Sequence, residues 1–252
     1  MYGRIVLFPR GFFPRRTRYV RERICGVTFL RAEVFLPPEA RSGAVHRALE
    51  RTARELKKQG FSYAVTPPDF SFGEILRQCG LIPVSTAGLC RAMAASMAFL
   101  ALEAEGIDPS KATVGLAAGR VTKAVEQAAI GLCARVRHLA LEIPSGGGAL
   151  CRFLRGEYGM AVMEGATGLQ RADVLVLFSR VRQEYLPKNG IVLYLADDAP
   201  FSAYPGKIIR SAVFSPKEGL ILPSGSDETQ LLAALYECRA ISPKEIEIQD
   251  LS

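Results

Sequence analysis

The sequence has few of the residues that bind metal ions or transfer protons near neutral pH. It contains 2 histidines and 6 cysteines, and no two cysteines form a C-x-x-C pair. A structural zinc site needs four such ligands at short paired spacing, so we expect no metal site. With so few histidines, an acid or base would have to be sought among lysine, aspartate and tyrosine.

The sequence also lacks a long uninterrupted apolar segment. The longest one, residues 92–102, lies between two charged residues and is much shorter than the roughly 20 residues that a membrane-spanning helix needs. Arg4 and Arg10 interrupt the apolar residues near the N-terminus, and no small-residue cleavage site follows them. We therefore expect a soluble, cytoplasmic protein that has no membrane segment.

Positive charge is concentrated near the N-terminus. Residues 1–60 hold 14 Lys and Arg against 5 Asp and Glu, whereas the other 192 residues hold 18 against 20. Segment 9–23 interleaves three aromatic residues with six arginines: Phe12, Phe13, Tyr19, Arg10, Arg15, Arg16, Arg18, Arg21 and Arg23. Arginines on phosphates and aromatic rings on bases would make a nucleic-acid arm. We favour the alternative, a solvated or oligomer-contacting loop, because no known nucleic-acid-binding motif accompanies the segment.

Residues 1–84 have the pattern of a small α/β domain. Residues 3–9 and 26–36 are expected to be strands, and residues 42–58 have the 3.6-residue period of a helix that Ser42 would cap. A strand over 61–66, a helix over 72–79 and a strand over 81–84 follow. Asp69 lies before that second helix and is either its N-cap, which we favour, or an acid–base or substrate-binding residue.

Residues 85–252 predict a second domain with a mostly parallel sheet. An apolar helix is expected from Ser85 or Thr86 to Gly106, buried between two layers. The βαβ alternation that follows is typical of a parallel sheet covered on both faces. Its strands are expected at 113–117, 138–143, 160–163, 174–178, 191–195 and 207–214, and its helices at 120–135, 149–157 and 228–240, before an acidic tail.

The loop VGLAAGRVTKAV joins the first of these strands to the next helix. A dinucleotide-binding loop has the pattern G-x-G-x-x-G, and here its three glycine positions hold Ala117, Gly119 and Thr122. The backbone N–H groups of Arg120, Val121 and Thr122 at the helix start would favour an anion, and Arg120 adds a positive charge. The sequence therefore predicts a phosphate site with incomplete glycines, and the alternative is a turn that only connects strand and helix.

Two further positions could complete such a site, and a third place could bind a metal. Glu142 ends the next strand 23 positions after Gly119, close to the interval of about 20 expected for the acidic residue that binds a ribose. Its carboxylate would repel a 2′-phosphate and so favour NAD over NADP. Ser145 begins the run SGGG, which would either wrap the adenosine or only form a flexible turn. Asp197-Asp198 could bind a metal, but adjacent carboxylates point apart, so a loop or cap is favoured.

Residues 85–195 resemble the cofactor domain of two-domain Rossmann-type dehydrogenases such as shikimate dehydrogenase, glutamyl-tRNA reductase and methylenetetrahydrofolate dehydrogenase. The matching features are the entering helix, the loop AAGRVT, Glu142 and the segment GLQRADVLVLFS. In those families an Ala-Asp pair before the fourth strand and small polar residues after it border the nicotinamide, and Ala172-Asp173 and Ser179 match these places. The resemblance implies NAD or NADP as the cofactor.

The expected fold is therefore α/β, with a small N-terminal α/β domain in residues 1–84 and a Rossmann-like, mostly parallel sheet in residues 85–252. Our leading hypothesis is an NAD(P)-dependent oxidoreductase that acts on a small-molecule substrate in an interdomain cleft, with Asp69 as the candidate catalytic residue. The alternative is a non-catalytic Rossmann-like protein that binds a nucleotide, or a protein or nucleic-acid partner, through its basic N-terminal face. A homo-oligomer is compatible with both.

Overall fold

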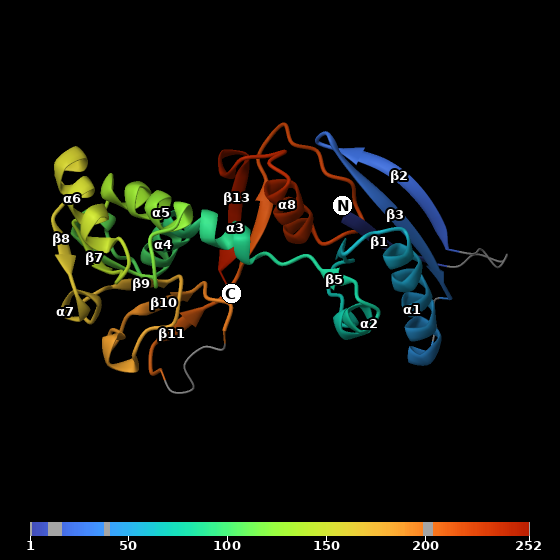
Figure 1. Ribbon diagram of the computed structural model, residues 1–252, viewed down its shortest axis with the longest axis horizontal. Coiled ribbons are helices and arrows are strands. Elements are labelled where there is room, and N and C mark those ends of the chain that lie inside the picture. The colour runs from blue at the N-terminus through green and yellow to red at the C-terminus, as the bar shows by residue number, and fades with distance from the viewer. Residues whose placement is uncertain (1, 10–16, 38–40, 199–203, 252) are drawn as a thin grey trace. The chain divides into compact units, whose positions relative to one another are not determined.

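The computed structural model describes residues 2–9, 17–37, 41–198 and 204–251 (Figure 1). The chain divides into two compact units. One comprises Met1–Thr86 and Phe214–Glu247, and the other comprises Ala87–Val213 and Ile248–Ser252. Compared with the expected domains of 1–84 and 85–252, this division groups residues 214–247 with the N-terminal unit.

The first unit is built on a five-stranded sheet with the order β2-β3-β1-β4-β5. β2 is antiparallel to β3, and the other neighbours pair in parallel. The unit is thus the α/β structure predicted for the N-terminal region. Its elements are β1 (Tyr2–Pro9), β2 (Arg18–Ile24), β3 (Val27–Leu36), α1 (Ser42–Lys58), β4 (Tyr63–Val65), α2 (Gly73–Gln78), β5 (Ile82–Pro83) and α8 (Glu228–Glu237).

The two faces of this sheet are covered by different parts of the chain. Because neighbouring side chains of a strand point to opposite faces, Ile5 packs with Leu49 of α1, whereas Arg4 points to the other face. There the Arg4 guanidinium donates to the Ser226 hydroxyl, just before α8. Figure 1 shows α1 and α8 on opposite sides of β1.

The strand β2 lies in the segment predicted to be a loop. Its sequence RYVRERI carries four charged residues, which hid its strand pattern. It is an edge strand, where charged side chains are common because they oppose pairing with another chain. Cys25 and Gly26, with φ of 46° and 82°, form the tight turn into β3. The predicted arm residues Arg10, Phe12, Phe13, Arg15 and Arg16 lie outside the described residues.

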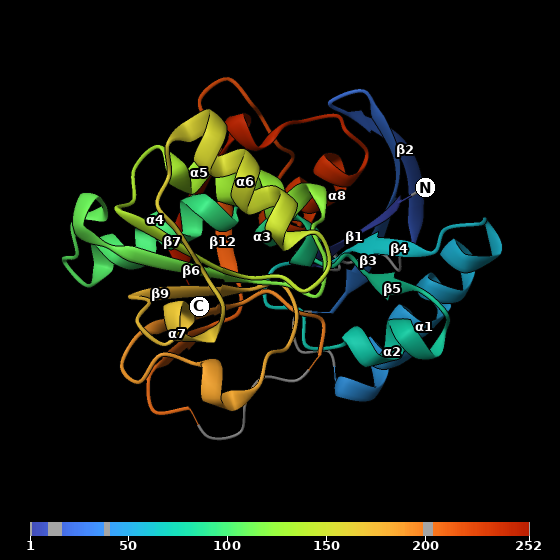
Figure 2. The ribbon, with the colours of Figure 1, turned by 60° about the vertical axis from the view of Figure 1, so that its left-hand side comes forward.

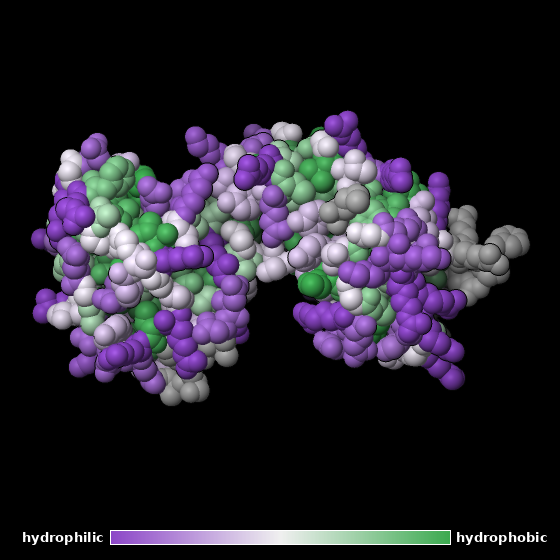
Figure 3. Space-filling model, viewed as in Figure 1, coloured by the Kyte–Doolittle hydropathy of each residue, from purple (hydrophilic) through white to green (hydrophobic). Residues whose placement is uncertain are grey.

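The outer side of α1 adds positive charge to the first unit. Hydrophilic side chains gather over this helix in Figure 3. Four exposed basic residues, Arg47, Arg51, Arg54 and Lys58, are spaced by four, three and four positions, which places them on one helical face. The opposite face of α1 is apolar and buries Leu49 against the sheet.

The second unit contains a six-stranded parallel sheet with the order β11-β10-β9-β6-β7-β8. The chain enters at the central strand β6, adds β7 and β8 on one side, and returns to the other side of β6 for β9, β10 and β11. This is the strand order of the Rossmann fold, so the predicted fold is confirmed. In Figure 2, α4, α5 and α6 lie on one face of the sheet and α7 lies on the other.

The helices and strands of the second unit have the following bounds. They are α3 (Ala87–Ala92), α4 (Ala94–Ala104), β6 (Thr113–Ala117), α5 (Lys123–Cys133), β7 (His138–Glu142), α6 (Gly147–Tyr158), β8 (Val162–Glu164), α7 (Ala166–Leu169), β9 (Val174–Leu177), β10 (Ile191–Tyr194) and β11 (Lys207–Ile209). The chain also forms a two-stranded sheet from β12 (Ala212–Pro216) and β13 (Ile246–Leu251), so the predicted tail is a strand.

Two helices begin or divide differently from the prediction. The apolar helix expected from residue 85 to 106 is two helices, α3 and α4, separated at Met93. α5 was expected to begin at Arg120, but it begins at Lys123 because Thr122 adopts an extended conformation and caps the helix. Arg120 and Val121 therefore belong to the loop between β6 and α5.

Candidate functional site

A cavity of about 700 Å³ lies at the carboxyl ends of the parallel strands in the second unit. β6 and β9 are neighbours here, although the chain passes through β7 and β8 between them. Open α/β sheets bind ligands at such a switch point, so the position of this cavity makes it the candidate site. Its polar side chains come from α3 and from the loops after four strands: Arg91, Arg120, Thr122, Ser145, Ser179 and Asp197.

The loop after β6 leaves room for an anionic group. A Cβ atom on Gly119 would meet nothing nearer than the Ser179 Oγ atom at 3.9 Å, and Gly119 does not have a left-handed φ. Ala117, at the first glycine position, is the buried last residue of β6. Thr122, at the third, accepts a hydrogen bond on its Oγ1 atom from the Val125 N–H at 3.4 Å. The residues present therefore fit a phosphate group beside Gly119.

Only part of this loop can donate backbone hydrogen bonds to a ligand. The Val121 N–H donates to the Ser145 carbonyl at 3.0 Å, and the Ser145 N–H donates to the Gly119 carbonyl at 3.3 Å. The Val121 side chain also lies against Gly146, where an added Cβ would be 3.2 Å from Val121 Cγ2. Val121 is thus removed from the three predicted donors, and Ser145 joins the two loops.

Glu142 stands at the predicted strand end but does not line the cavity. It is the last residue of β7 and pairs with Ala117 of β6, and its carbonyl accepts from the Ala118 N–H at 3.2 Å. The pairing of the two chain segments resumes beyond it at Arg120 and Ser145. The loops after β6 and β7 are therefore joined just beyond Glu142, and the assignment of Glu142 to the ribose stays a prediction.

Arg91 reaches the cavity from α3, and no sequence motif pointed to it. Its Nε atom donates to the Leu195 carbonyl at 2.9 Å, and a terminal nitrogen lies 2.5 Å from Asp197 Oδ1. The side chain of Arg91 is 28% exposed and that of Asp197 is 79% exposed. The signal that could have identified Arg91 is a lone arginine in an otherwise apolar segment, because such residues are rarely buried without a partner.

The neighbouring carboxylates after β10 contact different partners, as predicted for Asp197-Asp198. Asp197 pairs with Arg91, whereas Asp198 accepts a hydrogen bond of 2.7 Å from the hydroxyl of Tyr194. Within the described ranges, no three His, Cys, Asp or Glu side chains gather where they could hold a metal ion. No helix among these residues is long and apolar enough to span a membrane.

Tyr194 is expected to make the stability of the protein depend on alkaline pH. Burial, together with the hydrogen bond and negative charge of Asp198, raises the pKa of Tyr194 from 10.0 to about 12. The folded state favours the neutral hydroxyl of Tyr194. The stabilisation that Tyr194 gives the folded state is therefore complete below pH 10 and is lost as the pH rises toward 12. Tyr194→Phe should lower the unfolding free energy at pH 7 by about 1 kcal/mol.

Urea unfolding of both proteins between pH 7 and 12 checks this expectation. The difference between wild type and Tyr194→Phe should shrink across the alkaline range, while tyrosines elsewhere affect both proteins equally. A constant difference across that range would contradict the assignment. Asp198→Asn is a useful second variant, because it removes the charge and retains an oxygen acceptor for the hydroxyl of Tyr194.

Asp173 lies at the edge of the sheet opposite the cavity. It precedes β9, and its carboxylate accepts a hydrogen bond of 2.8 Å from the N–H of Thr113, the first residue of β6. The predicted place of Ala172-Asp173 beside a nicotinamide is therefore wrong for this chain, because residues before parallel strands lie at their amino ends. Ser179, which follows β9, lines the cavity.

Asp69 belongs to the first unit and is not the predicted helix cap. α2 begins after Phe72, and no side chain caps it. Asp69 instead occupies a turn after β4 and has a φ of 52°, a left-handed conformation that aspartate adopts more readily than most residues. The catalytic role of Asp69 stays a prediction.

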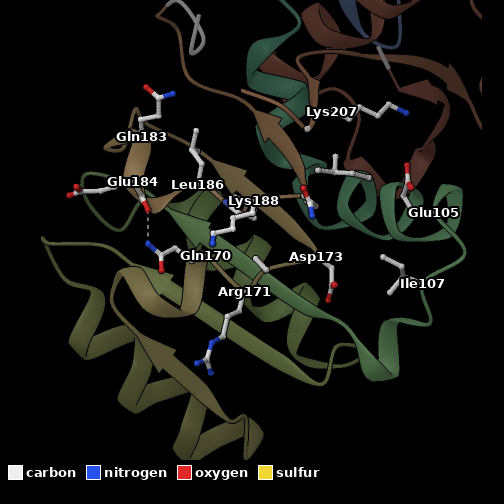
Figure 4. Close-up of a pocket in the computed structure, with 16 residues that line it drawn as sticks. Glu105, Ile107, Gln170, Arg171, Asp173, Gln183, Glu184, Leu186, Lys188 and Lys207 are labelled. Carbon is white, nitrogen blue, oxygen red and sulfur yellow. Dashed lines mark hydrogen bonds between the residues drawn. The ribbon is translucent and has the colours of Figure 1, made fainter. Parts of the chain in front are cut away.

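A larger cavity of about 950 Å³ borders the amino ends of the strands. Exposed charged side chains of both signs surround it, among them Arg171, Glu184, Lys188 and Lys207. In Figure 4 the Arg171 and Lys207 side chains point in different directions, and Gln170 is bonded to the Glu184 carbonyl at 2.7 Å. Because no group of like charges converges here, the smaller cavity is the better candidate.

No protein-family model matches the chain, and no curated protein sequence does. Among solved structures, a dipicolinate synthase subunit from Bacillus halodurans is 13% identical, with a TM-score of 0.38 over 71% of this chain and 66% of that one. L-tryptophan dehydrogenase from Nostoc punctiforme is 11% identical, with a TM-score of 0.34 over 76% and 61%. Shikimate 5-dehydrogenase from Listeria monocytogenes, in complex with shikimate and NAD, is 7% identical, with a TM-score of 0.31 over 64% and 67%. The chain thus spans slightly less than two thirds of the length of the first two.

Proposed function

We propose that the protein is an NAD(P)-dependent oxidoreductase whose second unit binds the cofactor phosphates in the cavity at the switch point. One observation carries the proposal: Gly119, which no contact within the protein requires to be glycine, opens onto a cavity lined by Arg120 and Ser179. The start of α5 has a partial positive charge that favours a phosphate. The Rossmann strand order is the usual frame for such a site.

Each lining residue would have a distinct task. Gly119 would let the backbone approach the pyrophosphate, and Arg120 would neutralise its charge. Ser179, which follows β9, would border the nicotinamide side of the cavity. The cofactor would supply the hydride chemistry. If Glu142 holds the ribose, NAD is favoured over NADP.

Calorimetric titration with NAD, NADP and adenine mononucleotides tests this proposal. We expect at least one dinucleotide to bind, and Arg120→Gln to weaken its affinity about tenfold, because a charge-assisted hydrogen bond contributes about 1.5 kcal/mol or more. Arg137→Gln is the matched control, since Arg137 is exposed just before β7, at the other edge of the sheet. No binding of either dinucleotide at millimolar concentration would overturn the proposal, as would equal losses in the two variants.

A second candidate function is favoured by the two hydrogen bonds that Ser145 makes with the loop after β6, one from the Val121 N–H and one to the Gly119 carbonyl. Because they join the loops beside Glu142, the cavity would suit a mononucleotide bound without catalysis. The same titrations separate the two functions. A dinucleotide whose affinity falls in Glu142→Ala supports the first, whereas a mononucleotide that binds equally well to wild type and Glu142→Ala supports the second.

A further inference from the structure

Arg91 lines the cavity from α3 and is held against the loop after β10 in a way that leaves part of its guanidinium exchangeable. The Nε atom is anchored by the carbonyl of Leu195, the buried residue that follows β10. A terminal nitrogen is bound by the carboxylate of Asp197, whose side chain is 79% exposed. The anchor fixes the direction of the side chain, and the second contact is with a group free to turn into solvent.

Asp197 occupies the place that an anionic group of a ligand would take. A guanidinium presents a planar set of donors that matches the two oxygens of a carboxylate or phosphate. An ion pair with a partner this exposed contributes little to stability, so exchanging one carboxylate for another is not strongly opposed. Breaking an ion pair is costly where both partners are buried, and here only Arg91 is mostly buried.

We propose that Arg91 selects a reactant with its own carboxylate or phosphate group, and that Asp197 holds the guanidinium in position until this group replaces it. The proposal rests on the proposed function in one respect: the cofactor phosphates would lie beside Gly119 and Arg120, which line the same cavity. The cavity would then hold two anionic groups, each facing one arginine. The second reactant is accordingly an anionic small molecule.

The test uses two variants for which the proposal predicts opposite effects. Inorganic phosphate and malonate are titrated into the whole protein, and binding is followed by calorimetry and by the NMR signal of the Arg91 Nε–H group. Asp197→Asn frees the guanidinium and should tighten binding of the preferred anion about three- to tenfold. Arg91→Gln should weaken binding at least tenfold. Preference for malonate or for phosphate distinguishes a carboxylate from a phosphate reactant.

Arg155→Gln is a matched control, because Arg155 also bonds one backbone carbonyl, that of Val162, and one carboxylate, that of Glu164. Arg155 does not line the cavity, so anion affinity should stay unchanged. If Asp197→Asn weakens binding or leaves it unchanged, the proposal is wrong even where Arg91→Gln fails to fold. Phosphate and malonate can be titrated without a dinucleotide. If the two variants change anion binding in opposite directions although neither NAD nor NADP binds, the role of Arg91 is supported and only the proposed function is wrong.

Discussion

Replacing Glu22 with leucine is expected to lower the unfolding free energy by about 3–5 kcal/mol, because the change leaves a buried charge without its partner. Arg4 is 1% exposed in the centre of the first unit. Its Nε atom lies 2.5 Å from one Glu22 oxygen, and a terminal nitrogen lies 3.3 Å from the other. Removing Glu22 would leave the guanidinium in a region of low dielectric with only neutral acceptors.

The loss of Glu22 should also destabilise the segment that precedes α8. Besides Glu22, Arg4 donates to the Ser226 hydroxyl at 3.0 Å and to the carbonyl of Ser224 at 3.2 Å. Glu22 also pairs with Arg31 at 3.2 Å, so one carboxylate orients two guanidiniums on the same sheet face. The network therefore connects β1, β2 and β3 to residues far along the chain. Faster hydrogen exchange at residues 224–230 in Glu22→Leu would report this connection.

Urea denaturation of Glu22→Leu and Glu50→Leu compares the unfolding free energy lost when a buried ion pair is broken with that lost when an exposed ion pair is broken. Glu50 pairs with Arg54 on the exposed side of α1, so its removal should change the unfolding free energy by less than about 1 kcal/mol. The double variant Arg4→Met, Glu22→Leu should recover part of the loss, because an apolar pair no longer leaves an uncompensated charge on Arg4. Equal effects of the two single variants would refute the role of the network.

Elements with a strong local pattern were predictable from the sequence to within a residue. α1 spans residues 42–58 as its helical period indicates, and β6 spans residues 113–117 as its apolar run does. Elements that depend on distant partners were not. β2 is a strand because it pairs with β3, and a run of arginines alone gives no such indication. α5 begins late because Thr122 is extended and caps the helix, after Val121 has paired with Ser145 of another loop.

The candidate site shows the same division. Gly119, Arg120, Thr122, Ser145 and Ser179 line one cavity, because residues that follow parallel strands meet at one edge of the sheet, and their binding of a cofactor stays a prediction. Arg91 was missed because its proximity to the cavity depends on how α3 packs, which no local pattern contains. Asp173 lies away from the cavity because a residue that precedes a parallel strand lies at the amino edge of the sheet.

Replacing Gly119 with valine is expected to weaken cofactor binding about a hundredfold or more while leaving stability nearly unchanged. A Cβ atom there would meet nothing within 3.9 Å, and the backbone is not left-handed, so the fold does not require glycine. The change in unfolding free energy should stay within about 0.5 kcal/mol. The added methyl groups would occupy the space through which a phosphate approaches the backbone.

Gly115→Ala provides the contrasting control, four residues earlier in the same strand–loop unit. A Cβ atom at Gly115 would lie 2.8 Å from a Leu175 methyl carbon and 3.0 Å from one of Leu169, so overpacking should cost about 1–3 kcal/mol. Ligand affinity of the folded protein should persist, because Gly115 lies in β6 and does not line the cavity. Calorimetry should therefore show lost affinity only in Gly119→Val, and urea unfolding should show lost stability only in Gly115→Ala. If Gly119→Val binds NAD or NADP as tightly as the wild type, no phosphate approaches Gly119, and the cofactor must bind elsewhere.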